Sequence, residues 1–111
     1  MDLKLQNLSI PSGWIMEWNV FYDLNPLELS MHEPLWDFFK EDMLYLKHKH
    51  IPYSLDLGWC PENDGNGNFI LRVIKDENWK APILNITSRN KDEIVAKLNE
   101  LMLAVSNGEI S

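Results

Sequence analysis

Two apolar, strand-like runs lie on the two sides of a glycine-rich loop in the middle of the chain. Residues 54–60 read SLDLGWC and residues 69–75 read FILRVIK. In an extended chain, Leu55, Leu57 and Trp59 lie on one face of the first run, and Phe69, Leu71 and Val73 lie on one face of the second. Between them, residues 61–68 (PENDGNGN) are of types that favour turns over extended structure. This pattern predicts a β-hairpin over residues 54–75, with an apolar face that needs a covering layer.

Two further stretches have the character of strands. Residues 14–22 alternate and place these side chains on one side: Trp14, Met16, Trp18, Val20 and Tyr22. Residues 79–87 predict another strand, which Pro82 places at a sheet edge or at a bulge. A weaker alternation in residues 1–12 allows one more short edge strand.

A helix is expected from about Glu33 to Lys47. Ser30 and Glu33 have the spacing of a capping box, and Pro34 suits the first helical turn. At 100° per residue the apolar arc of this helix comprises Leu35, Trp36, Phe38, Phe39, Met43 and Leu46. Asp42 does not fit this pattern, because it falls near the centre of that arc, where an unpaired carboxylate would be costly.

A second helix is expected after Asn90. Asn90-Lys91-Asp92-Glu93 is a second capping signature, and Asn107-Gly108 marks the end of the helix. Its apolar stripe comprises Ile94, Val95, Leu98, Leu101, Met102 and Val105.

The order of elements is therefore strand, helix, three strands and helix. Strands joined by tight turns pair antiparallel, and two helices with one apolar face each pack most simply on one side of the sheet. We predict a single α+β domain over residues 1–111, a two-layer sandwich with an antiparallel sheet of four to five strands and two helices on one face. The other sheet face would be open to solvent or to a partner.

Composition narrows the setting of this domain. The chain has 111 residues, 45% of them hydrophobic and 24% charged, as in globular proteins. Five tryptophans are many for this length and fit a dense core or a partner surface. A single cysteine, Cys60, fits a reducing compartment, and neither a signal peptide nor a membrane span is apparent. We therefore expect a cytoplasmic protein.

The formal net charge of −7 argues against nucleic-acid binding, which needs lysine and arginine to meet phosphates. The segment from residue 17 to residue 64 carries the whole excess, because it holds ten acids and three bases. The acids are Glu17, Asp23, Glu28, Glu33, Asp37, Glu41, Asp42, Asp56, Glu62 and Asp64. Such a one-signed surface could steer a basic partner, or it could simply be an acidic, solvated face.

No metal or cofactor site is predicted. The loop from Asp64 to Asn68 begins like a calcium loop, but its sixth position is Phe69 and its twelfth is Lys75, so we interpret it as a hairpin turn. The histidines His32, His48 and His50 do not have zinc-like spacing. A reactive Cys60 would need a base such as His50 beside it, and the sequence alone does not place one there.

The predicted first helix would carry a stripe of acids, Glu33, Asp37 and Glu41, on the side opposite its apolar arc. Leu44 lies within that stripe and should be exposed beside these acids. Acids around an apolar centre suit a basic partner, because charge speeds encounter and an apolar anchor holds the complex. The stripe and Leu44 are therefore candidate partner-binding residues.

Three segments resemble motifs of bacterial immunity proteins, which neutralise the toxin domains of polymorphic or contact-dependent toxin systems. They are Gly13-Trp14 through Asn19-Val20-Phe21-Tyr22, Asp56-Leu57-Gly58-Trp59, and the glycine-rich loop followed by Trp79. The resemblance implies a stoichiometric inhibitor without catalytic residues, which binds a toxin domain, often a basic nuclease, and occludes it. The acidic stripe would face that toxin, with a second acidic set of Glu17, Asp56, Glu62 and Asp64.

Two alternatives from other classes stay open. One is a small enzyme or metabolite-binding domain with a pocket between the sheet and the helices, near Asp42, His50 and Cys60. The other is a subunit of a larger assembly that uses the open sheet face.

Overall fold

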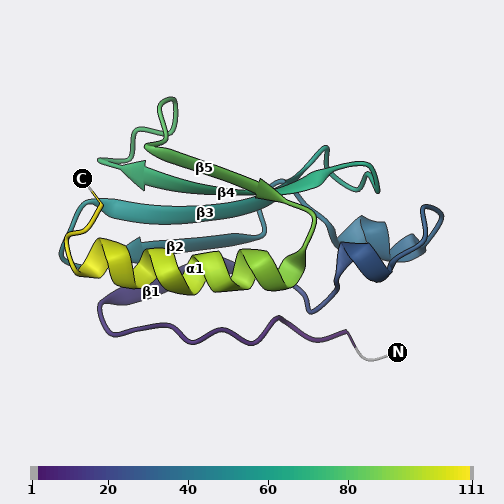
Figure 1. The fold of residues 1–111 in the computed structure, drawn as a ribbon, viewed down its shortest axis with the longest axis horizontal. Coiled ribbons are helices and arrows are strands. Elements are labelled where there is room, and N and C mark those ends of the chain that lie inside the picture. Colours follow the sequence, from purple (N-terminus) through teal and green to yellow (C-terminus); the bar gives the residue numbers. More distant parts are fainter. Residues whose placement is uncertain (1–2, 111) are drawn as a thin grey trace.

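The computed structural model describes residues 3–110 and has an α+β fold built on a five-stranded antiparallel sheet. The strands follow one another in chain order across the sheet, and a helix lies across one face (Figure 1). The strands are β1 (Trp14–Asn19), β2 (Leu44–His48), β3 (Tyr53–Cys60), β4 (Asn68–Lys75) and β5 (Leu84–Ser88). The helix is α1 (Lys91–Ser106), and two short 3-10 turns span Pro26–Glu28 and Pro34–Phe38.

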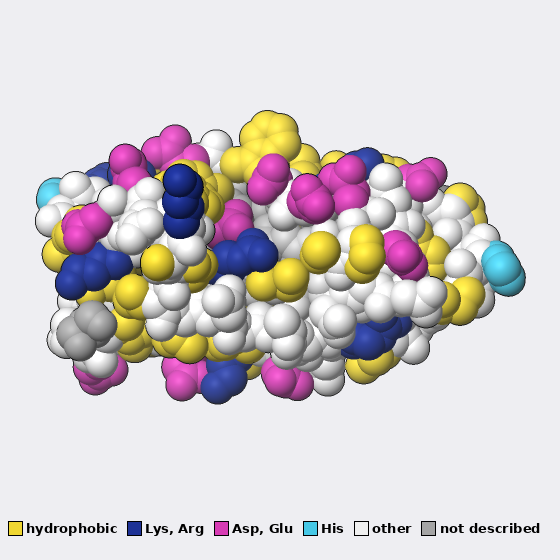
Figure 2. Space-filling model, turned by 90° about the horizontal axis from the view of Figure 1, so that it is seen from above, with side chains coloured by type: hydrophobic (Ala, Val, Ile, Leu, Met, Phe, Trp, Pro, Cys, Tyr) yellow, Lys and Arg dark blue, Asp and Glu magenta, His cyan; other side chains and the backbone are white. Residues whose placement is uncertain are grey.

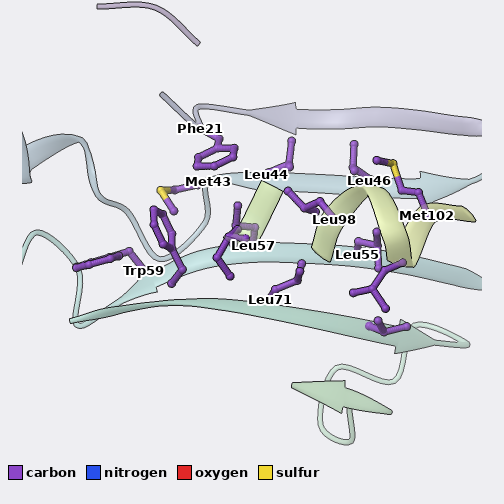
Figure 3. Packing of buried hydrophobic residues seen from close by; sticks show 14 of the residues in the cluster. Phe21, Met43, Leu44, Leu46, Leu55, Leu57, Trp59, Leu71, Leu98 and Met102 are labelled. Carbon is purple, nitrogen blue, oxygen red and sulfur yellow. The ribbon is translucent and has the colours of Figure 1, made fainter. Parts of the chain in front are cut away.

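The predicted hairpin is confirmed and forms the centre of the sheet. β3 and β4 pair antiparallel along their whole lengths, with Leu57 opposite Leu71 and Trp59 opposite Phe69. These four side chains have no exposed surface, and the rings of Trp59 and Phe69 contact each other and the ring of Phe39. Around Leu98 of the helix, Figure 3 shows the core side chains of β2 and β3. Close packing of these large apolar groups is the main stabilising contribution to the fold.

The second helix is confirmed together with its cap. The Asn90 side chain accepts hydrogen bonds from the N–H groups of Asp92 and Glu93, which satisfies two otherwise unpaired donors of the first turn. The predicted stripe faces the sheet, and Ile94, Leu98 and Met102 are fully buried. Trp14 of β1 holds the C-terminal end of α1, because its Nε1–H donates to the Met102 carbonyl (3.2 Å) and to the Ser106 hydroxyl (3.0 Å).

The predicted helix from Glu33 to Lys47 is wrong, so a single α-helix, not two, covers the sheet in the part that the structure describes. Only Pro34–Phe38 coils, as a 3-10 turn, and its cap residue Glu33 makes no side-chain capping bond. Leu44–His48 is the strand β2, which lies between β1 and β3 and pairs with both. Two ladders of hydrogen bonds outweigh the helical spacing of the apolar residues.

This correction relocates the residues that the helix would have carried. Leu44 is 1% exposed rather than exposed beside acids. Asp42 lies just before β2 with an exposed side chain, so it does not belong to an apolar arc and its misfit with the predicted helix disappears. Glu33, Asp37 and Glu41 do not share a helix face, because 39–43 is not helical.

The edges of the sheet depart from the simple alternation. β1 ends at Asn19, and a register shift between Met16 and Trp18 turns Trp18 to the face opposite α1. β5 begins after Pro82 and is an edge strand, as that proline indicated. Within residues 3–12, Leu5 forms an isolated bridge with Tyr22 rather than a strand, and residues 1–2 of the predicted edge strand lie outside the described residues.

Candidate partner-binding face

The sheet face opposite α1 carries a row of polar and aromatic side chains at its centre. Tyr45 on β2 pairs with Asp56 on β3, which in turn pairs with Arg72 on β4. All three side chains point away from the helix because their strand neighbours Leu44, Leu57 and Leu71 point into the core. Among the described elements no helix covers this row, so this is the open face of the sheet.

Two tryptophans stand over the open face and are half exposed. Trp18 on β1 is 52% exposed, and its Nε1–H donates to the backbone carbonyl of Asp42 (3.0 Å). Trp79, in the connection between β4 and β5, is 49% exposed and contacts the Tyr45 ring with 5.3 Å between centroids. Hydrogen bonding and ring contact hold both indoles in place although half of each surface faces solvent.

The connection 76–83 reaches over the sheet to place Trp79. Because β3 lies between β2 and β4, contact between Trp79 and Tyr45 requires this connection to cross above β3. Asp76 and Glu77 begin it with left-handed φ values of 55° and 57°, which non-glycine residues adopt at a cost. Glu77 is tied to Lys47 of β2 by an ion pair of 3.1 Å.

Beneath the two indoles lies a cavity of about 350 Å³, here named the aromatic cavity. Its lining residues are Trp18, Asp42, Leu44, Tyr45, Asp56 and Trp79. Neighbouring hollows of about 400, 220 and 340 Å³ each share Trp18, Asp42 or Tyr45 with it as a lining residue. In Figure 2 the open face is the upper margin, where acidic groups lie on both sides of a projecting hydrophobic group.

Asp56 is the buried carboxylate of this face. It is 6% exposed, and one of its oxygens accepts a hydrogen bond from the Arg72 guanidinium at 3.3 Å. Burial raises the pKa of Asp56 above its ordinary value of 3.8, Arg72 opposes that rise, and the nearby Asp42 adds slightly to it. The negative charge of Asp56 is thus incompletely compensated within the chain.

The predicted acidic residues are brought together only in part. The carboxylate of Glu62 accepts the backbone N–H of Glu41 at 3.1 Å, which joins the hairpin loop to the segment before β2. Asp42 lies in the same region and lines hollows together with each of them. Glu17 is exposed on β1, next to Trp18.

The other predicted site residues lie apart from this group. Glu33 and Asp37 belong to the 3-10 turn region, where Asp37 is exposed and Glu33 half buried. Asp64 acts within the hairpin loop, since its carboxylate accepts the Asn66 N–H (2.8 Å) and its carbonyl accepts the Trp59 indole N–H (2.7 Å). Leu44 contributes to the aromatic cavity from below but is otherwise buried.

The residues of the enzymatic alternative do not form one constellation. His50 precedes β3 and Cys60 ends it, and strand geometry separates the two ends of that eight-residue strand by roughly 23 Å. Cys60 and Asp42 do line a common hollow with Arg72, on the open face rather than between sheet and helix. Within residues 3–110, no three His, Cys, Asp or Glu side chains gather as a metal site would require.

Sequence reasoning missed the aromatic members of this face. The excess of tryptophan indicated either a core or an interface, and the structure divides it between both: Trp14, Trp36 and Trp59 are buried, whereas Trp18 and Trp79 are half exposed. The alternation of β2, with Tyr45 between Leu44 and Leu46, was the available signal for Tyr45.

Comparison with known proteins gives no relatives: no family model, curated protein or solved structure matches the chain. In the described part of the chain, no helix has the length and apolar character needed to cross a membrane.

Proposed function

We propose that this protein is a stoichiometric binding protein, an immunity protein that neutralises a basic toxin domain by occupying part of its surface with the open sheet face. It would perform no catalysis and would act in the cytoplasm. The toxin's lysine and arginine side chains would face Asp42, Glu41 and Glu62, which line the hollows next to the aromatic cavity.

The observation that carries the proposal is the pair of half-exposed tryptophans among carboxylates on the sheet face that no helix covers. Tryptophan is the residue type most enriched among residues that dominate binding energy, and exposed indoles held in fixed positions lose little entropy on association. The charge distribution supports the same partner class. The segment from residue 17 to residue 64 holds the whole excess of negative charge, which favours rapid encounter with a basic surface.

The alternatives have less support. The enzymatic alternative loses its base, because His50 lies at the far end of β3 from Cys60. Self-assembly through the open face would bring two acidic surfaces together at a net charge of −7 per chain, and that repulsion disfavours it relative to a basic partner.

The experiment is neutralisation of a toxin domain encoded immediately upstream of this gene. Co-expression should protect cells, and the purified proteins should form a 1:1 complex in which toxin activity is lost. Replacing both Trp18 and Trp79 with alanine should weaken the complex by at least about 30-fold, which corresponds to about 2 kcal/mol.

The matched control is Leu103→Ala. Leu103 is an equally exposed apolar residue (53%) on α1, away from the open face, and its removal should leave affinity unchanged. Full toxin activity in the presence of equimolar wild-type protein would refute the proposed function. Unchanged affinity of the double tryptophan variant would refute the assignment of the face.

A further inference from the structure

The aromatic cavity has the chemistry of a receptor for a single cationic group. Three of its six lining residues are aromatic, two are carboxylic acids, and none is Lys, Arg or His. Aromatic faces carry partial negative charge and attract cations within about 6 Å of the ring. The lining therefore offers negative potential from both its walls and its carboxylates.

Among the described residues, no lysine, arginine or histidine lines this cavity. Arg72 donates to Oδ2 of Asp56 through one bond of 3.3 Å and does not line the cavity. Lys47 is drawn away to Glu77 at 3.1 Å. The Trp18 indole N–H is already donated to the Asp42 carbonyl, so this donor does not oppose a cation.

We infer that the aromatic cavity binds an arginine side chain of the partner protein, with the guanidinium stacked on the Trp79 and Trp18 rings and hydrogen-bonded to Asp42 and Asp56. This inference rests on the proposed function only for the identity of the partner.

The shape of the site favours arginine over lysine. A guanidinium is flat, stacks on indole rings and donates in a fork that matches carboxylate oxygens, whereas an ammonium is a compact and strongly hydrated charge. The two indoles approach the cavity from β1 and from the connection 76–83, on opposite sides of the central strands. A cation there would also complete the compensation of Asp56, whose pKa is raised by burial.

The test uses the intact ¹⁵N-labelled protein and N-acetyl-arginine methylamide as the probe, with the lysine and glutamine analogues at the same concentrations. The indole N–H signals of Trp18 and Trp79 should shift in a saturable manner with a roughly millimolar dissociation constant for arginine. The lysine analogue should bind at least about threefold more weakly, and the glutamine analogue should produce no saturable shift.

Two variants and a control locate the binding. Asp42→Asn and Trp79→Ala alter exposed side chains, so folding should persist, and each should weaken arginine binding about fivefold. Leu103→Ala should not change it. Equal or tighter binding of lysine, a shift that does not saturate, or arginine affinity unchanged in both variants would overturn the inference.

These results are separable from the proposed function. Saturable arginine binding with no neutralisation of the toxin would leave the arginine site standing and refute the immunity role. Neutralisation of the toxin without saturable arginine binding would leave the immunity role standing and refute the arginine site.

Discussion

Replacing Gly58 with alanine should destabilise the protein severely, because the chain before β2 lies directly against this position. Gly58 is on β3 and faces the open side of the sheet, where a Cβ atom would lie 1.8 Å from the Glu41 carbonyl oxygen. Observed Cβ contacts are essentially never shorter than 3.0 Å, so the Glu41 backbone would have to move by about 1.2 Å.

The movement would strain two hydrogen bonds that hold the segment to β3. The Trp59 N–H donates to the Lys40 carbonyl at 2.8 Å, and the Met43 N–H donates to the Leu57 carbonyl at 2.9 Å. Overpacking costs about 1–3 kcal/mol, and a buried group left without its partner costs about 1–3 kcal/mol. We therefore expect a loss of about 3–5 kcal/mol, a large part of the roughly 5–15 kcal/mol typical of a domain.

Urea unfolding followed by tryptophan fluorescence measures the effect. With an m-value of about 2 kcal/mol/M, the midpoint should fall by roughly 1.5–2.5 M. Ser54→Ala is the control, because Ser54 is buried on the same face of the same strand, and its effect should be about 1 kcal/mol or less. A Gly58→Ala midpoint equal to or above that of the wild type would refute the placement of residues 40–43, and with it the position of Asp42.

Three further predictions concern single groups. Burial raises the pKa of Asp56 in the folded state above 3.8. Between the unfolded and the folded pKa, the folded protein therefore holds a proton that the unfolded chain has lost, and stability falls as pH rises. The stability of wild type relative to Asp56→Asn should decline from pH 3.5 upward and then level off, whereas a rise would contradict the reasoning. The Nδ1 of His48 accepts the N–H groups of His50 and Ile51, and burial, with a smaller contribution from His50, lowers the pKa of His48 below 6.5. The stability that neutral His48 contributes is fully present above pH 6.5 and is lost as pH falls toward the lowered pKa. Between pH 7 and pH 5 the unfolding midpoint of wild type should therefore drop more than that of His48→Asn. An equal drop in the two proteins would exclude a stabilising role of neutral His48. Asn90→Ala should cost about 1 kcal/mol in urea unfolding through loss of the α1 cap, whereas Asn90→Asp should retain most of it; equal stabilities of the two variants would show that the cap contributes nothing.

The central hairpin and α1 could be predicted because their signals are local. Alternation on both sides of residues 61–68 specifies two strands that can reach each other only through a tight turn. In α1, a cap at Asn90 and an apolar stripe of helical period agree with each other. Neither element needs distant parts of the chain to decide its type.

β2 could not be distinguished from a helix by the same reasoning. Between residues 33 and 47, aromatic and aliphatic residues are dense enough to satisfy a helical arc, and Ser30 with Glu33 imitates a helix start. What decides the structure is pairing with β3, which follows directly along the chain, and with β1, whose partner residues lie about 25 to 34 positions earlier. Because the helix was wrong, the predicted environments of Leu44 and Asp42 and the predicted acidic stripe were wrong as well.

The candidate site depends on two backbone features that no pattern in the sequence predicts. The register shift beyond Met16 turns Trp18 to the open face, and nothing in the alternation of residues 14–22 marks it. The left-handed residues Asp76 and Glu77 direct Trp79 over β3, although neither is the glycine that usually marks such a conformation. The acidity of the surface could be predicted, but its aromatic centre could not.

Binding of a basic partner to the open sheet face can be measured directly through the five tryptophans. With 5-fluorotryptophan incorporated and each ¹⁹F signal assigned by substitution, the purified toxin domain is added to one equivalent. Trp18 and Trp79, which are 52% and 49% exposed, should shift strongly, whereas the signals of Trp36 and Trp59, which are 4% and 0% exposed, should change little. A stable complex in which the Trp18 and Trp79 signals stay at their free positions would contradict binding at this face.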